Sequence, residues 1–421
     1  MQKIVSLLTF IKNCYTMKKK WILILSIFLG VSLFSQTNKD LLFLEKELEN
    51  HNYLFHTLNK NNFKKIIQKE QTKTDSLTRW KIDELLANFK EFNLKTISNK
   101  EEEIIFKIKS INNKLYITNI SKEYSFLLEE EIIKLNKISI NALKKRIKQK
   151  FYLSNTIIVE TFLEQNLGRF SFLNYLGYIK NNSIDIVTKN FKGKITVSSS
   201  NLEEIKIEKP LFKNRRNDLW FWSYGINFGQ QVYLKFNHIL SDSHLKKIKD
   251  SLKWSNYKYA KTYHIPIQST YNAPKFINLI NKLHVKFGNK RYKKLIIDFR
   301  DTRFGTTYNL DFFISHLKKI KKLHKKKSIY VLFNKHTNGT SLKYIKSLQE
   351  NFKPVLVGES AYGTYSDSNE VNIIELPISK IKIQIPIKHQ QEIEIKPNIK
   401  VIQTLQQTKK GIDAGLNKCL E

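Results

Sequence analysis

Three observations predict a mixed α/β fold. Apolar residues recur at helical spacing from Thr37 to about Ser98, and short alternating runs are mixed with helical ones from Glu103 to Val197. The last 200 or so residues alternate continuous apolar strands with amphipathic helices. We therefore expect α/β, mixed α+β overall: an N-terminal helical bundle over 37–100, a small mixed α/β region over 101–200, and a βα core over 201–421.

The first 36 residues have the pattern of a signal peptide. Lys18, Lys19 and Lys20 precede the apolar run Trp21–Phe34, which is shorter than the roughly 20 residues that span a bilayer. Ser35 is the small residue that suits cleavage, and Met17 is the alternative start. We expect export to the periplasm or cell envelope of a Gram-negative-type bacterium; the alternative is an uncleaved membrane anchor.

Three short amphipathic helices are expected in the bundle. Thr37 and Asp40 resemble a capping box before a leucine stripe. Asn61 or Asn62 would cap the second helix and Thr78 the third.

The middle region mixes both periodicities. Leu115–Ile120 alternates like a strand, Ser154–Leu176 has helical spacing, and two runs predict a hairpin, Ile184–Thr188 and Lys194–Val197. Ser198–Asn201 is the best linker candidate.

Continuous apolar strands separated by helical patterns indicate a parallel sheet with crossover helices in the C-terminal part. The strands are Val232–Phe236, Leu295–Ile297, Ile329–Phe333 and Pro354–Val357, and an alternating strand, Ile381–Ile387, closes the pattern. The helices between them are centred on Leu310–Leu317 and Leu342–Glu350.

The net charge is +36, from 73 basic and 37 acidic residues, and only 8 of the basic residues are Arg. Lys, Asn and Ile are enriched together, which indicates A/T-rich codon usage; attraction to anionic envelope polymers is the alternative. Export and the scarcity of Arg, which forks phosphates and base edges, argue against nucleic acid as a partner.

Several kinds of chemistry are excluded by motif. Two Cys and ten scattered His give no metal-ligand spacing, and there is no Gly-rich phosphate loop or Gly-x-Ser-x-Gly elbow. We therefore expect no metal and no cofactor.

A linked set of segments in the C-terminal half carries the functional information. They occur in the order Lys294–Arg300, Tyr330–Thr337, Val355–Gly363, Ile395–Ile399 and Gly411–Leu416. Order, spacing and residue types resemble the tail-specific, C-terminal-processing serine peptidases, including the interphotoreceptor retinoid-binding and tricorn-type relatives. Asn52–Phe55, Glu131–Asn136 and Tyr233–Asn237 extend the resemblance upstream.

The resemblance implies a ClpP/crotonase-like βα core and a PDZ-like middle region. It also implies serine-peptidase chemistry, which needs an activated hydroxyl, oxyanion donors and a bed for an extended peptide. In that family the nucleophilic Ser follows the Asn of the second strand by about five residues. It precedes the Gly of a Val-Gly-Glu turn by about nineteen.

Both counts reach Gly339. From Asn334 forward and from Gly358 back, the expected nucleophile position holds Gly. Thr340 and Ser341 are adjacent, so a slip of one or two residues would make either the nucleophile, with His336 or Lys343 as base.

The other implied positions are also altered. Thr364 occupies the position where the family has a Lys base. The family also has a Gly-rich loop after the Asp-Phe-Arg strand end, and only Gly305 of that loop remains here. Asp298 and Arg300 keep the strand-end pattern around the implied oxyanion loop.

Each of these residues also has a purely structural interpretation. Asp298 and Arg300 would pair at the strand end, Glu359 would pair with a Lys, and Ser341 would be the N-cap of the helix from Leu342 onward.

The sequence thus predicts an exported, catalytically degenerate peptidase-like protein that binds a peptide or protein tail. It would touch the membrane only through an uncleaved signal segment. Two alternatives stay open: an active serine endopeptidase using Ser341 or Thr340, and a cationic envelope-binding protein without a peptide groove.

Overall fold

The structure is a computed structural model of the chain. It describes residues 39–72, 77–91, 94–97, 103–196, 202–206, 221–226, 230–239, 276–288, 292–302, 307, 309–323, 327–365 and 371–421. The predicted signal segment 1–36, the linker Ser198–Asn201 and Gly305 lie outside the described residues.

The chain forms two compact units. Unit 1 comprises residues 1–101 and 371–387, and unit 2 comprises 102–370 and 388–421. The three-part division expected from the sequence stays a prediction, but the return of 371–387 to the N-terminal unit was not anticipated.

Unit 1 begins with helices. Residues 39–49 are helical, followed by η1 (Asn52–His56), α2 (Lys60–Gln71), α3 (Arg79–Leu86) and η2 (Ala87–Phe89). The Thr78 side chain accepts the N–H of Lys81, which confirms the predicted cap of α3. The predicted caps Asn61 and Asn62 are wrong, because Asn59 caps α2 and accepts the N–H of Asn61.

A three-stranded antiparallel sheet completes unit 1. Its order is β1 (Lys95–Ile97), β16 (Lys382–Pro386) and β15 (Val371–Glu375). Asp40 is buried, and its carboxylate accepts the N–H groups of Ile378 and Ser379 in the β15–β16 turn. Leucines of the first helix share a core with this hairpin: Leu41, Leu44, Leu48, Leu376, Ile383 and Ile385.

The middle part of unit 2 has two small antiparallel sheets and three helices. The sheets are ordered β2-β3-β8 and β5-β4-β6-β7. The elements are β2 (Phe106–Ile111), β3 (Lys114–Ser121), η3 (Lys122–Leu127), β4 (Lys134–Leu135), β5 (Ile138–Ser139), α4 (Ile140–Lys150), α5 (Thr156–Asn166), α6 (Phe170–Tyr175), β6 (Ser183–Val187), β7 (Lys192–Thr196) and β8 (Leu202–Glu204). The β6–β7 hairpin confirms the predicted one. The helical pattern over 154–176 is two helices broken at Gly168, where a Cβ would lie 1.6 Å from the Phe106 carbonyl oxygen.

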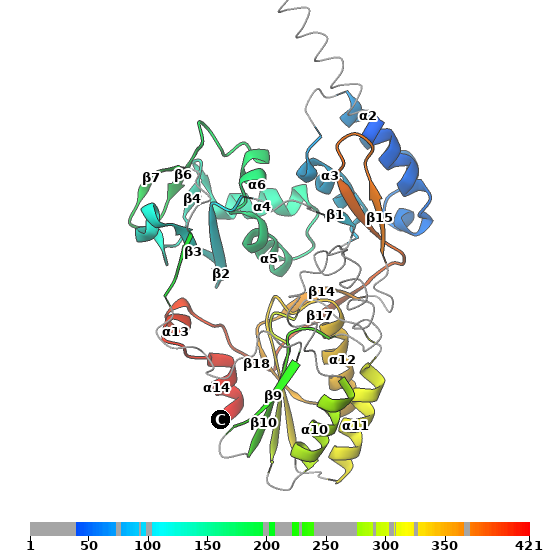
Figure 1. Cartoon of the computed structure of the whole chain (residues 1–421). Coiled ribbons are helices and arrows are strands. Elements are labelled where there is room, and N and C mark those ends of the chain that lie inside the picture. Colours follow the sequence, from blue (N-terminus) through cyan, green and yellow to red (C-terminus); the bar gives the residue numbers. More distant parts are fainter. Residues whose placement is uncertain are drawn as a thin grey trace, which may run out of the picture. The chain divides into compact units, whose positions relative to one another are not determined.

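The rest of unit 2 is built on a six-stranded sheet in the order β18-β13-β12-β11-β10-β9 (Figure 1). Its pairs are parallel except β9–β10. The strands are β9 (Phe221–Ile226), β10 (Gln231–Phe236), β11 (Lys294–Asp298), β12 (Ser328–Phe333), β13 (Val355–Gly358) and β18 (Ile399–Lys400). This confirms the predicted parallel sheet.

Helices cover both faces of this sheet (Figure 1). One face packs against α10 (Phe276–Gly288), α11 (Leu310–Leu323) and α12 (Thr340–Phe352), through alternate residues such as Leu295, Ile297 and Val331. The other face, with Ile296 and Leu332, packs against α14 (Ala414–Leu420). Alternation of side chains along each strand divides the two cores. Two further strands pair separately, β14 (Ala361–Tyr365) with β17 (Gln391–Ile395), and α13 (Leu405–Lys409) precedes α14.

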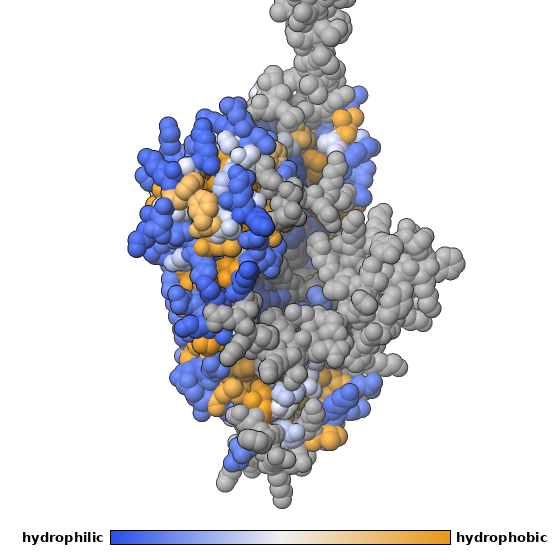
Figure 2. Space-filling view, turned by 60° about the vertical axis from the view of Figure 1, so that its left-hand side comes forward, coloured by the Kyte–Doolittle hydropathy of each residue, from blue (hydrophilic) through white to orange (hydrophobic). Residues whose placement is uncertain are grey.

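Hydrophilic side chains dominate the coloured surface in Figure 2, as the lysine-rich composition leads one to expect. Within the described part of the chain, no helix combines the length and apolarity needed to cross a membrane.

Candidate functional site

The implied nucleophile position lies at a sharp strand-to-helix turn. β12 ends at Phe333, and α12 begins at Thr340 with Gly339 as its N-cap at φ 60° and ψ −131°. That conformation is strained for residues with a Cβ and open to glycine. The Asn338 side-chain oxygen accepts the N–H of Gly339 at 2.6 Å, which fixes the turn. The residue that both sequence counts reach is therefore the last one of this turn, the elbow, and it carries no side chain.

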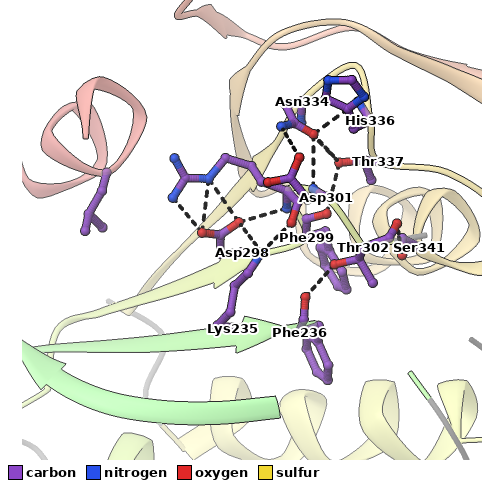
Figure 3. A network of polar contacts seen from close by, with 12 residues as sticks. Lys235, Phe236, Asp298, Phe299, Asp301, Thr302, Asn334, His336, Thr337 and Ser341 are labelled. Atoms are coloured by element: carbon purple, nitrogen blue, oxygen red, sulfur yellow. Dashed lines mark hydrogen bonds and ion pairs between the residues drawn. The ribbon is translucent and has the colours of Figure 1, made fainter. Parts of the chain in front are cut away.

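The neighbouring hydroxyls point into the fold. Ser341 is 1% exposed, and its hydroxyl donates to the Thr302 carbonyl oxygen at 3.3 Å (Figure 3). Thr340 is 3% exposed. The interpretation of Ser341 as N-cap is wrong, because Gly339 holds that place and Ser341 is the second residue of the helix.

The implied base position lacks a basic nitrogen. The Thr364 hydroxyl donates to the side-chain oxygen of Gln390 at 2.6 Å. Its neighbour Gly363 faces the elbow, since a Cβ there would lie 2.0 Å from the side-chain oxygen of Asn338. Side chains alternate along a strand, so Thr364 points away from that turn.

The two bases considered for an active enzyme have other contacts. His336 Nε2 lies 2.8 Å from the Glu164 carboxylate. Lys343 Nζ lies 4.9 Å from the centroid of the Tyr365 ring. Neither residue therefore stands ready to take a proton from Ser341.

The buried carboxylate of Asp298 forms an ion-pair network with Arg300 at the end of β11, and Figure 3 shows Asp298 beside Lys235. Arg300 lies 2.6 Å from Asp298 and 2.7 Å from Asp413, the N-cap of α14. Tyr233 donates to Asp298, and Lys235 Nζ lies 3.4 Å from it. Burial alone would raise the pKa of Asp298, but Arg300 and Lys235 outweigh it and hold that pKa well below its usual range. The pairing agrees with the structural interpretation; the role of Asp413 was missed.

Asn334 is the first residue of the loop between β12 and α12, and its side chain holds that loop through hydrogen bonds. Its side-chain oxygen accepts the N–H groups of Asp301 and His336, and its amide nitrogen donates to the Asp301 carboxylate at 3.0 Å (Figure 3). Asp301 has φ 60°, so this turn also uses a left-handed residue. Asn334 is thus a scaffold residue of the loop that ends in the elbow.

The Val-Gly-Glu turn at Val357–Glu359 packs against the end of β12. A Cβ on Gly358, at φ 133°, would lie 1.9 Å from the Phe333 carbonyl oxygen, so only glycine fits. The interpretation of Glu359 as a Lys partner is wrong for the described residues, where no Lys nitrogen lies within 4.0 Å of it. Burial raises the pKa of Glu359, although the charges of Lys335, Lys109 and His336 oppose that rise.

A cavity of about 480 Å³ opens at the carboxyl ends of the parallel strands. Lys235, Asp298, Phe333 and Gly358 line it from successive strands, and β2 and α5 add further residues. Crevices outside these strand ends are the usual ligand sites of open α/β sheets. Gly339 and the two adjacent hydroxyl residues do not line it, so the cavity and the elbow are separate features of unit 2.

Helix α5 anchors the elbow loop through buried charges. The Glu164 carboxylate lies 2.7 Å from Lys335 Nζ and accepts the backbone N–H of Ser110 at 2.6 Å, besides its contact with His336. Burial would raise the pKa of Glu164, but His336 and Lys335 lower it to about 2. Sequence reasoning missed this cluster, because Glu164 occupies an ordinary helical pattern some 170 residues from its partners.

Within the described part of unit 2, no three His, Cys, Asp or Glu side chains bring ligand atoms within 4.8 Å of one another. The expectation that the chain needs no metal or cofactor stays a prediction.

No protein-family model matches the sequence, and neither does any curated protein. Solved structures do match. Mature CPAF complexed with lactacystin has a TM-score of 0.58 at 9% identity, over 92% of this chain and 97% of that one. A Ser→Ala mutant of CPAF has a TM-score of 0.57 at 10% identity, over 90% and 95%. The photosystem II D1 C-terminal processing protease also matches, at a TM-score of 0.36 and 8% identity over 87% and 93%. The chain therefore has the α/β fold of CPAF, the tail-specific-peptidase-like fold that the sequence resemblance predicts.

Proposed function

We propose that this chain is an exported, catalytically degenerate protein of peptidase fold that binds peptides or unfolded tails. The observation that carries the proposal is Gly339, which stands at the strand-to-helix elbow where the resemblance expects a nucleophilic Ser. An acyl transfer through this position has no hydroxyl to begin from.

The surroundings of the elbow support the loss of chemistry. Thr364 offers a hydroxyl in place of a basic nitrogen, and that hydroxyl donates to Gln390. Asp301 follows the strand end where the family has a Gly-rich loop, and its carboxylate is held by Asn334 beside the elbow loop. A fixed negative charge would oppose a developing oxyanion there.

Strand β14 supports peptide binding. It pairs with β17 along one edge, and no other described strand pairs with it. Gly363 on this strand abuts Asn338, so the strand runs beside the elbow. An extended peptide that adds to an unpaired strand edge gains main-chain hydrogen bonds without covalent chemistry.

The second candidate is an active serine endopeptidase that uses Ser341 or Thr340. It is kept because both hydroxyls lie within two residues of the elbow. The geometry disfavours it: Ser341 is buried and already donates to Thr302, and the nearby His336 is held by Glu164. The third candidate, a cationic envelope-binding protein, depends on the net charge of +36.

Labelling with a fluorophosphonate probe tests degeneracy. We expect the folded chain to stay unlabelled while an unrelated serine hydrolase in the same tube is labelled. Lactacystin, with which CPAF has been solved, serves as a second probe. Labelling that is lost in Ser341→Ala or Thr340→Ala would overturn the proposal and identify the nucleophile. Labelling that survives both substitutions would overturn it as well.

Peptide binding is tested by fluorescence polarisation with extended peptides and with copies N-methylated at alternate residues. Strand addition predicts that the methylated copies bind at least about tenfold more weakly, because they lose N–H donors. Equal binding of both copies would exclude a strand-edge site. Binding only to anionic polymers, lost in salt, would favour the cationic candidate.

Export is tested on cells. We expect the chain in the periplasmic or envelope fraction with its N-terminus near Gln36, read by mass spectrometry. Deletion of residues 1–36 should retain it in the cytoplasm. An intact N-terminus in a membrane fraction would instead indicate an uncleaved anchor.

A further inference from the structure

The cavity at the strand ends contrasts with the charge of the whole chain. Five basic and five acidic side chains line it, so their formal charges cancel, whereas the chain carries +36. Its volume of about 480 Å³ lies in the range of roughly 300–1,000 Å³ that small-molecule sites have. A balanced lining of this size disfavours a polyanion and suits a small molecule with charges of both signs.

Most of the lining charges already have protein partners. Asp298 and Asp413 share Arg300. Glu164 is held by Lys335 and His336. These groups form the rigid wall of the cavity and have little capacity left for a ligand.

Two lining residues of opposite charge, Glu359 and Lys109, do not pair with each other. The Glu359 carboxylate has no ion pair within 4.0 Å among the described residues. Lys109 on β2, the other charge, is close enough to Glu359 to lower its pKa but too far away for an ion pair. The space between them is therefore bounded by an anion on the sheet side and a cation from the middle region.

We propose that this cavity binds a small zwitterion of the free amino acid or dipeptide class. The ligand ammonium group would lie against Glu359, and its carboxylate would lie against Lys109. This site is separate from the elbow and from the β14 edge, so it does not depend on the proposed peptide binding. The raised pKa of Glu359 agrees with a carboxylate that lacks its cation in the unliganded protein.

Isothermal titration of the purified full chain with free L-amino acids and dipeptides tests the assignment. Each ligand is compared with its N-acetyl derivative, which lacks the ammonium group, and its amide, which lacks the carboxylate. We expect both derivatives to bind at least about tenfold more weakly, since each loses one charged contact. Equal binding of either derivative, or no binding of any zwitterion to a protein that melts cooperatively, would overturn the proposal.

Variants localise the site. Glu359→Gln and Lys109→Gln should each weaken zwitterion binding about tenfold or more. Glu394→Gln on the exposed face of β17 is the matched control and should leave it unchanged. If Glu359→Gln does not fold, Glu359→Asp keeps the charge and should show a smaller loss. Unchanged affinity in Lys109→Gln and in the folded Glu359 variant would place the ligand elsewhere and refute the inference.

Discussion

Replacing Glu164 by Gln should destabilise unit 2 markedly. The carboxylate is 8% exposed and makes three contacts: with Lys335, with His336 and with the backbone N–H of Ser110. Gln keeps the size and can still accept the N–H of Ser110. It removes the negative charge, which leaves two basic groups facing a neutral amide in a buried place.

The pKa of Glu164 gives the magnitude. The pKa falls from 4.5 to about 2, and at about 1.4 kcal/mol for each pH unit this corresponds to about 3–4 kcal/mol at neutral pH. Removal of one partner of a buried pair usually costs about 3–5 kcal/mol, in agreement with that figure. We therefore expect the free energy of unfolding to fall by about 3–4 kcal/mol at pH 7.

The sign of the pH dependence follows from the lowered pKa. The stabilisation is fully present above pH 4.5, the ordinary pKa, and it is lost as the pH falls toward 2. Urea unfolding followed by circular dichroism from pH 7 to pH 2 should show the variant and the parent converging across that window.

Glu131→Gln is the matched control. Glu131 also pairs with a Lys, at 2.8 Å from Lys114, but the carboxylate is 31% exposed and the Lys 55%. An exposed pair contributes at most about 1 kcal/mol. If Glu164→Gln costs no more than Glu131→Gln, or if its difference from the parent persists at pH 2, the reasoning from buried charge is refuted.

Three further predictions concern the same unit. Gly358→Ala should lower the free energy of unfolding in urea by more than about 3 kcal/mol, because the new Cβ would lie 1.9 Å from the Phe333 carbonyl oxygen and φ is 133°. The control Gly177→Ala, at φ 73° with nothing within 4 Å, should cost only about 1–2 kcal/mol. Equal losses in the two variants would contradict the packing argument. Asp413→Asn should release α14 from Arg300 and speed amide hydrogen exchange over residues 414–420, at a cost of about 3 kcal/mol; unchanged exchange would mean that the ion pair does not hold the helix. Glu359→Gln should raise the melting temperature at pH 7 and the free energy of unfolding by roughly 0.5–2 kcal/mol, because burial raises the pKa of Glu359 and penalises its charged form. The gain should vanish in acid, where the carboxyl group of the parent protein is protonated. A loss of stability at pH 7 would refute this prediction.

Local patterns predicted much of the core sheet. β11, β12 and β13 are continuous apolar runs, and their spacing leaves room for the crossover helices that α11 and α12 provide. Such strands are buried on both faces, which is why hydrophobicity alone locates them. The cap Thr78 was found for a similar reason, since it depends on a backbone N–H three residues away.

Pairing between distant residues left no such signal. Thr96 on β1 lies opposite Ile383 on β16, and no local pattern records that register. The predicted capping box cannot be followed to Thr37, which lies outside the described residues, and no local pattern records that the Asp40 carboxylate binds the turn at Ile378 and Ser379. The same limit hid the α5 cluster, because a Glu on a helix looks solvated until its distant partners are placed.

The two counts from the family resemblance meet at Gly339, which is the N-cap of α12; that it stands at the nucleophile position stays a prediction. Gly and Ser are both acceptable N-caps, so composition could not decide between Gly339 and Ser341. The spacing is counted from two residues that are fixed against the scaffold. The Asn334 side chain makes four hydrogen bonds, to Asp301, His336 and Thr337, and Gly358 approaches Phe333 closely.

The conformation of Gly339 bears on why the elbow would persist without its hydroxyl. Any residue with a Cβ at φ 60° and ψ −131° costs about 1–3 kcal/mol, which an enzyme tolerates because the strain presents its nucleophile. If binding alone is required, Gly removes that strain while Asn338 and Gly363 keep the turn in place. The substitution would then stabilise the fold and abolish catalysis in one step. We expect Gly339→Ser to lower the free energy of unfolding by about 1–3 kcal/mol and to stay unlabelled by fluorophosphonate, because Thr364 stands at the implied base position and His336 is held by Glu164. A Ser variant as stable as the parent would show that the turn carries no strain.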